Sequence, residues 1–368
     1  MPPSAPSIDA TLLRGTSGGT ARFRERFEQQ FADDFFRLTA TGVTVSSIGL
    51  GTYLGDNTDT DDAAYEAAIV HAIKSGINLI DTAINYRSQR SERAIGAAIQ
   101  QVLASGHATR DELVICSKGG YIPLDRTPPA TREEYQAYVR REFIDQQIVH
   151  PDEIVGGGHS LAPRFLRYCL AKSRQNLGLR TIDIYYVHNP GQLLSSVSPD
   201  DLRGRLRAAF AMLEEAAARS EIGVYGCATW DELRVPPDAK GHLGLEEMVA
   251  IAREVAGESH RFRVIQAPIN LALLEAVRVP SQPLGDRVVP MVEAAAELGI
   301  TVIGSASLMQ ARLTAGLPPA LQDHFPDAKT DAQRAIAFAR SLPGVTASLV
   351  GMKQTRHVDE NLESAKRM

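Results

Sequence analysis

The chain has 368 residues, 44% of them hydrophobic and 23% charged, a composition ordinary for a water-soluble globular protein. Its net charge of −5 gives no indication of a nucleic-acid partner or of binding to an anionic membrane. No apolar run approaches the length of a membrane span, and the first residues lack the basic start and apolar core of a signal peptide. The three scattered cysteines form no CxxC pair, so we expect a cytoplasmic protein with reduced thiols.

The first part of the chain predicts two features. Residues 1 to about 30 are rich in Pro, Gly, Ser and Arg, which predicts a loosely held extension. A β-hairpin is expected next, with strands at 36–40 and 43–45 that are joined at Thr41-Gly42. We see no internal domain boundary after the extension and expect 31–368 to form one domain.

From residue 46 onward, short β-branched runs alternate with amphipathic helices that often end at a glycine. The predicted strands lie at 46–51, 78–82, 113–118, 182–188, 222–228, 263–267, 301–305 and 348–351. The helices predicted between them include 62–75, 92–105, 163–177 and 286–298. This alternation predicts an α/β fold, a (β/α)8 TIM barrel, with a doubly wound sheet as the alternative.

A long insertion, residues 119–160, interrupts the regular spacing after the third predicted strand. It contains several prolines, a glycine run at 156–158, and a helix predicted at 132–144. Thr131 and Glu134 have the spacing of a capping box that starts this helix. We expect the insertion to overhang the barrel mouth as a pocket wall or lid, and a solvated excursion without function is the alternative.

Polar residues close three of the predicted strands. Asp81, Lys118 and His188 each end a short apolar run, and Tyr86 follows soon after the first of them. In parallel α/β proteins the C-terminal ends of the strands meet at the mouth where chemistry takes place. We therefore expect these four side chains to form one site.

The four residue types suit proton transfer to a carbonyl oxygen. A phenol alone has a pKa near 10 and is a poor acid at neutral pH. A neighbouring ammonium lowers that pKa, and a carboxylate paired with the ammonium keeps it charged and in place. A histidine beside them donates a hydrogen bond to the same oxygen. Such a group predicts carbonyl reduction, with the hydride supplied from elsewhere.

Each residue also has a simpler interpretation. Asp81 alone would cap the next helix, Lys118 would be a solvated loop cation, and His188 would be a hydrogen-bonded turn residue. The glycines at 49–55 have the wrong spacing for a Rossmann loop.

Two other histidines, His150 and His159, flank acidic residues but show no metal-ligand spacing. We therefore expect no metal site in this protein.

Several segments together resemble the aldo-keto reductase superfamily. They are 76–86 followed by Ser91-Glu92 and Gly96, then Ser117-Lys118, Val187-His188-Asn189-Pro190, 266–270, and 351–361 with its terminal Glu360-Asn361. They follow one another in order from about residue 43 to the end, interrupted by the insertion. The set is specific, although no single segment is.

The resemblance implies a barrel that binds a nicotinamide cofactor, usually NADPH, without a Rossmann fold. It implies Tyr86 as the general acid, Lys118 and Asp81 as the residues that tune it, and His188 as the residue that orients the carbonyl. It also implies that Gln266 binds the nicotinamide carboxamide. The cofactor-binding residues expected from it are Gly51, Thr52, Tyr53, Asp81, Asn189, Thr229, Gln266, Ser305, Ala306, Ser307, Leu308, Gly351, Lys353, Arg356, Glu360 and Asn361.

The chain departs from the family pattern at the cofactor positions. Ala228 and Thr229 stand where Ser-Asn often holds the carboxamide, and Ser305 stands near the usual stacking aromatic. Lys353 and Arg356 are candidates to bind a 2′-phosphate, although neither is in the usual register. NADP is therefore the preferred cofactor and NAD the alternative.

The function predicted is an NAD(P)H-dependent oxidoreductase acting on a small-molecule aldehyde, ketone or alcohol. Tyr53, Tyr121 and Trp230 are candidates for an aromatic wall of the substrate pocket. One alternative is a cofactor-binding redox sensor or regulatory subunit on the same fold. Another is a lyase or hydrolase with Lys118 as an amine nucleophile, which requires a lowered lysine pKa whereas pairing with Asp81 raises it.

Overall fold

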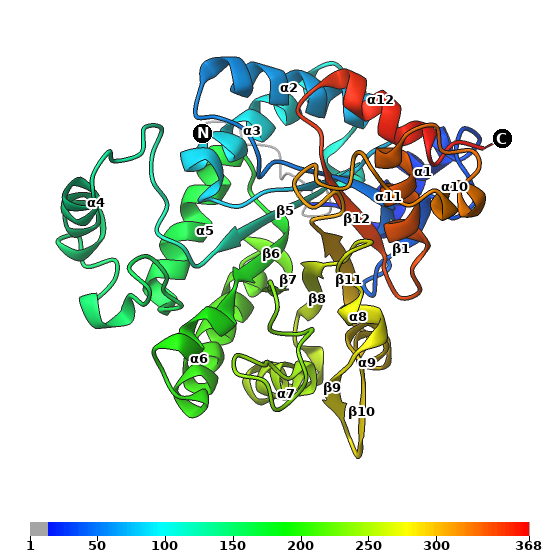
Figure 1. The fold of residues 1–368 in the computed structure, drawn as a ribbon. Coiled ribbons are helices and arrows are strands. Elements are labelled where there is room, and N and C mark those ends of the chain that lie inside the picture. Colours follow the sequence, from blue (N-terminus) through cyan, green and yellow to red (C-terminus); the bar gives the residue numbers. More distant parts are fainter. Residues whose placement is uncertain (1–13, 368) are drawn as a thin grey trace, which may run out of the picture.

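Eight parallel strands close into a barrel at the centre of the computed structural model, which describes residues 14–367 (Figure 1). The strands in barrel order are β3(Ile48–Gly51), β4(Leu79–Asp81), β5(Val114–Gly119), β6(Ile182–His188), β7(Ile222–Ala228), β8(Phe262–Pro268), β11(Thr301–Ser305) and β12(Ala347–Gly351). Each pairs in parallel with its neighbours, and β12 closes the circle against β3. The predicted (β/α)8 barrel is confirmed, and the doubly wound sheet was the wrong alternative.

Helices surround the strands in a ring (Figure 1). They are α2(Asp59–Lys74), α3(Arg90–Ala104), α5(Pro163–Leu177), α6(Pro199–Ala218), α7(Leu245–Ala256), α9(Met291–Glu297), α11(Asp331–Ser341) and α12(Thr355–Glu363), with the short α8(Glu275–Arg278) and α10(Ala320–His324) in the loops. Alternation along each strand fills two apolar layers. Tyr185 of β6 packs between strands and helices, whereas the next residue, Tyr186, packs inside the barrel.

The helix predicted at 286–298 begins later in the structure than expected. Residues 287–290 form β10(Arg287–Pro290), which pairs with β9(Pro280–Leu284) in an antiparallel hairpin that turns at Gly285. Gly285 has a φ of +59°, which favours a tight turn, and Pro290 has an extended conformation. The helix therefore begins only at Met291.

The N-terminal extension is structured in its described part. Residues 1–13 lie outside the described residues, but α1(Ser17–Phe27) is a helix capped by Thr16, so a loosely held segment up to residue 30 is wrong there. Phe23 is fully buried and lies 4.9 Å, between ring centroids, from Phe27. The composition of the segment, rich in Gly, Ser and Arg, gives no indication of a helix, although the two phenylalanines have the spacing of one helix face. The helix lies beside the predicted hairpin, β1(Phe36–Leu38) and β2(Thr44–Ser46), which is present.

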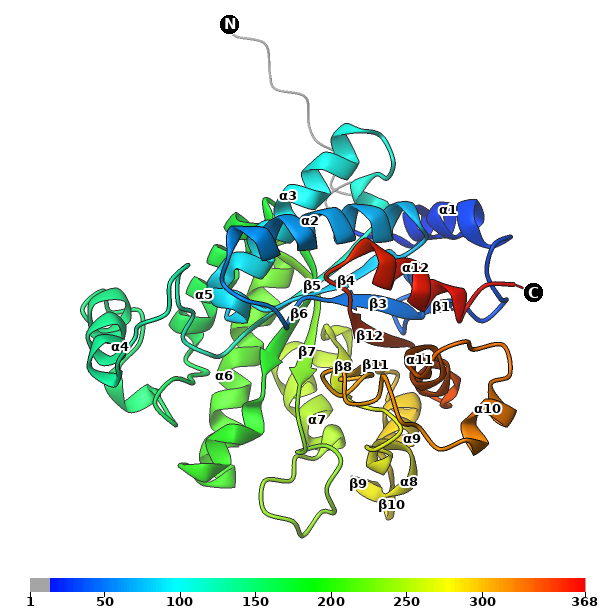
Figure 2. The same ribbon diagram turned by 45° about the horizontal axis from the view of Figure 1, so that its top comes forward.

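The insertion stands at the side of the barrel, at the left of both views (Figure 1, Figure 2). Its predicted helix is present as α4(Arg132–Val139) continued by a π-helical turn to Ile144. An apolar cluster that includes Ile122, Phe143 and Phe165 of α5 fixes it to the barrel. The insertion is therefore a packed part of the domain. No helix among residues 14–367 is long and apolar enough to cross a membrane.

The packing of α1 predicts the effect of a mutation. Phe23→Ala should lower the free energy of unfolding by about 3–5 kcal/mol, because it removes a fully buried ring and leaves a cavity. Urea denaturation measures this change. Arg24→Ala, at a half-exposed position of the same helix, should change stability by less than about 0.5 kcal/mol. An equally small effect of both substitutions would show that α1 does not pack on the barrel in solution.

Candidate active site

A buried ion pair lies at the mouth of the barrel. Asp81 ends β4 and Lys118 lies near the end of the adjacent β5, so parallel pairing brings the two side chains together. Lys118 Nζ lies 2.6 Å from Asp81 Oδ2 and donates a second hydrogen bond to the carbonyl of Thr82 at 2.8 Å. The lysine side chain has no exposed surface and that of Asp81 only 5%. One carboxylate and one backbone oxygen therefore hold the charged ammonium of Lys118 in place.

Tyr86 and His188 complete the group. Lys118 Nζ lies 4.9 Å from the centroid of the Tyr86 ring. His188 ends β6, and its ring centroid lies 6.0 Å from that of Tyr86. The structure thus brings together all four side chains expected from the strand ends, with Tyr86 between the ion pair and the imidazole.

The charges in this group have defined effects on the pKa values. Burial opposes the charge of Lys118, but Asp81 and Tyr86 outweigh it and raise the pKa of the lysine. Burial lowers the pKa of His188 well below its ordinary value, and the nearby Lys118 charge lowers it further. The site therefore holds a charged lysine beside a neutral imidazole at neutral pH.

The tyrosine does not have the lowered pKa that its lysine neighbour suggests. Burial has the largest effect and raises the pKa of Tyr86. Lys118 lowers it, Asp81 raises it, and the net direction is upward. The expectation of a lowered pKa is thus wrong, because burial of the phenol outweighs the field of the ammonium. Tyr86 is a protonated phenol, which can donate a proton.

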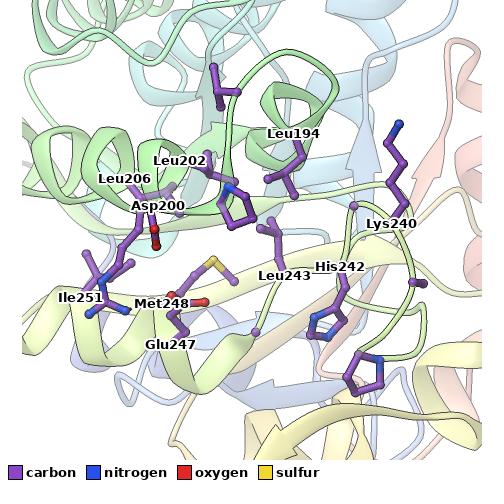
Figure 3. Close-up of a pocket in the computed structure, with 17 residues that line it drawn as sticks. Leu194, Asp200, Leu202, Leu206, Lys240, His242, Leu243, Glu247, Met248 and Ile251 are labelled. Atoms are coloured by element: carbon purple, nitrogen blue, oxygen red, sulfur yellow. Dashed lines mark hydrogen bonds and ion pairs between the residues drawn. The ribbon is translucent and has the colours of Figure 1, made fainter.

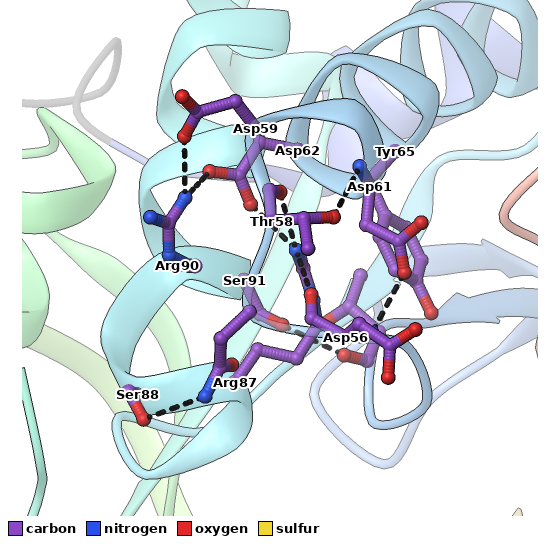
Figure 4. Close-up of polar contacts among 12 residues, drawn as sticks. Asp56, Thr58, Asp59, Asp61, Asp62, Tyr65, Arg87, Ser88, Arg90 and Ser91 are labelled. Atoms are coloured by element: carbon purple, nitrogen blue, oxygen red, sulfur yellow. Dashed lines mark hydrogen bonds and ion pairs between the residues drawn. The ribbon is translucent and has the colours of Figure 1, made fainter. Parts of the chain in front are cut away.

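The three residues that follow Tyr86 have an unusual backbone. Residues 87–89 all have positive φ values, 46°, 53° and 67°, and none of them is a glycine. The buried Arg87 guanidinium holds this turn by donating to the carbonyl of Asp56 and to Asp62 Oδ1 (Figure 4). Such strain persists only where surrounding contacts enforce it. No sequence pattern indicated this turn, because the usual marker, glycine, is absent.

Two unpartnered hydroxyls lie at strand ends beside β8. Thr229 follows β7 and Ser307 follows β11, and both hydroxyl oxygens are buried without a partner among the described residues. Between them on β8, the Gln266 amide donates to Asp81 Oδ1 at 2.9 Å. Buried hydroxyls normally have hydrogen-bond partners. These atoms suit a ligand with an amide or similar polar group, and a nicotinamide carboxamide fits that requirement.

The candidates for the adenine end have partners within the protein. Lys353 Nζ is bound by both carboxylate oxygens of Asp61, at 2.8 and 2.9 Å. Glu360 accepts a hydrogen bond from Thr330, and Asn361 is buried on the same helix, α12. Arg356 forms no ion pair within residues 14–367. The lysine charge is thus already balanced, whereas that of the arginine is not.

The aromatic candidates differ in their surroundings. Tyr53 is 56% exposed and its ring lies 5.0 Å from that of Tyr86, while Trp230 is 49% exposed. Tyr121 lies 4.9 Å from His188, measured between ring centroids, and its hydroxyl accepts a hydrogen bond from Asn189. Tyr53 and Tyr121 therefore flank the catalytic candidates.

His159 belongs to this site. The sequence pattern gave it no role, because its spacing does not suit a metal ligand. His159 Nε2 lies 2.6 Å from the backbone oxygen of His188, and its side chain is buried. No spacing rule links the two residues, because the insertion folds back to bring them together. Within residues 14–367, no group of three or more His, Cys, Asp or Glu side chains is arranged to hold a metal ion.

Comparison with known proteins decides the family. The model of the aldo/keto reductase family matches residues 47–244, more than half of the chain. The chain belongs to the aldo/keto reductase family.

Curated relatives match over part of their length. The NADH-specific methylglyoxal reductase of Escherichia coli K12 is 29% identical over 199 residues, 53% of this chain and 51% of that protein. The D-threo-aldose 1-dehydrogenase of a Pseudomonas species is 28% identical over 190 residues, 51% of each chain. The chain thus spans about half the length of these relatives.

Solved structures share the fold. An aldo/keto reductase from Klebsiella pneumoniae in complex with NADP and acetate superposes with a TM-score of 0.59 at 19% identity, over 89% of both chains. The holo form of AKR11C1 from Bacillus halodurans gives 0.58 at 15% identity, over 89% of this chain and 90% of that one. At these identities the likeness concerns the fold alone.

The remaining cofactor candidates of this aldo/keto reductase lie at the same end of the barrel. Gly51, Ser305 and Gly351 are the last residues of β3, β11 and β12. Of the other four, Thr52, Asn189 and Ala306 directly follow a strand, and Leu308 is the third residue after β11. The structure thus brings the candidates from different strands to one rim.

A separate pocket lies outside this rim. It has a volume of about 420 Å³ and lies between α6 and α7, with Leu206 and Met248 in its wall and Lys240 and His242 near its edge (Figure 3). None of the four catalytic candidates lines it. This pocket and the group of side chains at the strand ends are therefore separate features of the fold.

The burial of His159 predicts a dependence of stability on pH. Burial lowers the pKa of this histidine from 6.5 to about 4. As the pH falls from 6.5 to 4, the unfolded chain therefore takes up a proton that the folded protein does not. This difference should lower the free energy of unfolding by up to about 3 kcal/mol, and His159→Gln should remove that contribution. Urea unfolding at several pH values measures the slope, and equal slopes for both proteins would contradict the assignment.

Proposed function

We propose that this aldo/keto reductase is an NAD(P)H-dependent oxidoreductase that interconverts a carbonyl compound and its alcohol, with Tyr86 as the general acid and base. The observation that carries the proposal is the fully buried Lys118–Asp81 pair beside a protonated phenol and a neutral imidazole. A protein that only binds a ligand has no need of such a proton donor.

The roles of the residues follow from their charges. The bound nicotinamide supplies the hydride. Tyr86 donates its proton to the carbonyl oxygen, and the phenolate left behind is stabilised by the ammonium of Lys118. Asp81 keeps that ammonium charged and fixed. His188, being neutral, directs an N–H group to the same oxygen and orients the substrate. In the reverse direction Tyr86 accepts the proton of the alcohol.

We infer a small polar carbonyl compound as the substrate. The relatives are named for methylglyoxal and an aldose, which are of this kind. Tyr53 and Tyr121 beside Tyr86 and His188 support a narrow, partly aromatic entrance, and Trp230 is proposed for its outer edge. We propose that the enzyme acts in the cytoplasm.

Replacement of the general acid tests the proposal. Tyr86→Phe should lower kcat by about 10²- to 10⁴-fold, because the proton donor is lost, and should leave the Kd of the reduced cofactor nearly unchanged. Steady-state oxidation of NADPH or NADH with methylglyoxal and simple aldoses measures the first, and calorimetric titration the second.

The matched control is Tyr135→Phe, which removes a phenol hydroxyl of the insertion that bonds to Gly157. This variant should turn over as the wild type does. Substantial activity in Tyr86→Phe would refute its role as acid. Tight cofactor binding without turnover in the wild type would favour the redox-sensor alternative.

We propose NADP as the preferred cofactor, with Lys353 and Arg356 near the 2′-phosphate and NAD as the alternative. The two cations support this preference, whereas the bond between Lys353 and Asp61 weakens it, because the carboxylate competes with a phosphate for the same ammonium. One relative is NADH-specific and one structural neighbour holds NADP, so both cofactors occur among similar proteins.

Direct binding measurements test the cofactor preference. Lys353→Met should weaken NADPH binding by about 10-fold or more and NADH binding by less than about threefold, since only NADPH presents a phosphate to this cation. Asp61→Asn should strengthen NADPH binding. Calorimetric titration of both cofactors measures these changes, with Lys366→Met, which removes a lysine near the end of the chain, as the control. Equal losses for the two cofactors in Lys353→Met would place this lysine away from the 2′-phosphate.

A further inference from the structure

The chain makes an abrupt turn directly after the last residue of β6. Asn189 has a φ of +44°, in the left-handed region that non-glycine residues seldom adopt. Its N–H donates to the carbonyl of Ala228 at the end of β7. The backbone oxygen of His188 is bound by His159 from the insertion, with Nε2 at 2.6 Å.

The imidazole of His159 is fixed in one tautomer by this bond. A carbonyl oxygen only accepts hydrogen bonds, so Nε2 must carry the hydrogen and Nδ1 is bare. Nδ1 is buried and has no partner within residues 14–367. Burial lowers the pKa of His159 to about 4, so the ring remains a neutral donor at working pH. Burial of a bare nitrogen is a cost that the rest of the fold has to offset.

The two ends of the insertion close around this bond. The N–H of Ile122 donates to Gly158, and the N–H of Ser160 donates to Gly120, each at 2.8 Å. We call this paired segment, residues 120–122 and 158–160, the clasp. The clasp therefore holds His159 against the end of β6 by backbone hydrogen bonds.

Gly120 and Tyr121 of the clasp fit closely against the two histidines. A Cβ at Gly120, where φ is +146°, would lie 3.0 Å from both His159 Nε2 and the backbone oxygen of His188. The Tyr121 ring meets the rings of His159 and His188 edge-on, with centroids 4.7 and 4.9 Å away. Its hydroxyl accepts from Asn189 Nδ2 at 2.9 Å. The left-handed turn after β6 is thus held by the clasp on both sides.

We propose that His159 is a positioning residue of this enzyme: by binding the backbone oxygen of His188, it fixes the end of β6 and thereby the direction in which the His188 imidazole meets the substrate oxygen. The inference rests on the proposed oxidoreductase function. It gives the insertion a part in positioning a catalytic candidate.

Removal and restoration of the donor test this role. His159→Leu should lower kcat about 10- to 100-fold, as expected when a reacting group is slightly misplaced, while the Kd of the reduced cofactor changes by less than about threefold. His159→Gln, whose amide nitrogen extends about as far as Nε2, should recover most of kcat. A purely structural role would give two variants that differ in Tm and not in kcat. Equal kcat for His159→Leu and wild type would overturn the proposal.

A second pair of variants leaves both histidines in place. Gly120→Ala should lower kcat as His159→Leu does, because its methyl group enters the space between the two residues. Gly157→Ala is the control in the same insertion: its φ of +76° also disfavours a side chain, but no atom lies within 4 Å of the added Cβ. Equal effects of the two substitutions would attribute the loss to strain and refute the contact.

A readout without turnover separates this proposal from the proposed function. In ¹⁵N-histidine-labelled protein without ligands, the ring signals of His188 should shift in His159→Leu and return towards their wild-type positions in His159→Gln. If these shifts occur in a wild-type protein that reduces no carbonyl compound, the oxidoreductase function fails while the coupling of His159 to His188 stands. Unchanged His188 signals in His159→Leu would overturn the positioning role whatever the activity.

Discussion

Lys118 carries a positive charge in a position with no exposed side-chain surface, and this is tolerated only because Asp81 lies 2.6 Å from its Nζ. Removing a charge from water costs several kcal/mol, and a buried pair recovers that cost only with good geometry and satisfied hydrogen bonds. Both conditions are met here, since Thr82 and Gln266 bind the two partners from either side. The closed barrel makes these contacts possible because it brings β4, β5 and β8 to one rim.

Burial and the same ion pair together set the protonation of the neighbouring Tyr86 and His188. Burial keeps the phenol of Tyr86 protonated against the opposing charge of Lys118, and burial together with that charge disfavours the imidazolium of His188. The result is a protonated phenol and a neutral imidazole near each other at the barrel mouth. The electrostatic state of the site therefore depends on burial as well as on the ion pair.

Strained turns adjoin two of these groups. Residues 87–89 after Tyr86 and Asn189 after His188 all have left-handed backbones without being glycine. Each is held by side chains from elsewhere in the chain, Arg87 in the first case and His159 with Tyr121 in the second. Both catalytic candidates outside the ion pair thus sit beside a turn that the surrounding structure enforces, which is where functional sites commonly store strain.

The sequence by itself determined the barrel and the four residues at its mouth. Apolar runs that alternate with helices, and polar residues at their C-terminal ends, are local patterns, and parallel pairing brings such ends together. Asp81, Tyr86, Lys118 and His188 were predictable for that reason. The start of α9 was not predictable, because the hairpin at Gly285 takes up the residues before Met291. The packing of α1 was not predictable either, because a polar, glycine-rich composition gives no indication that Phe23 is buried.

Only the tertiary structure decided the charge balance and the support of the site. The pKa direction of Tyr86 depends on how deeply the folded chain buries the phenol and on its distances from Lys118 and Asp81. The pairing of Lys353 with Asp61 and the contact of His159 with His188 join residues far apart in the chain. No periodicity or spacing encodes them, because they arise where separate loops of the closed barrel meet.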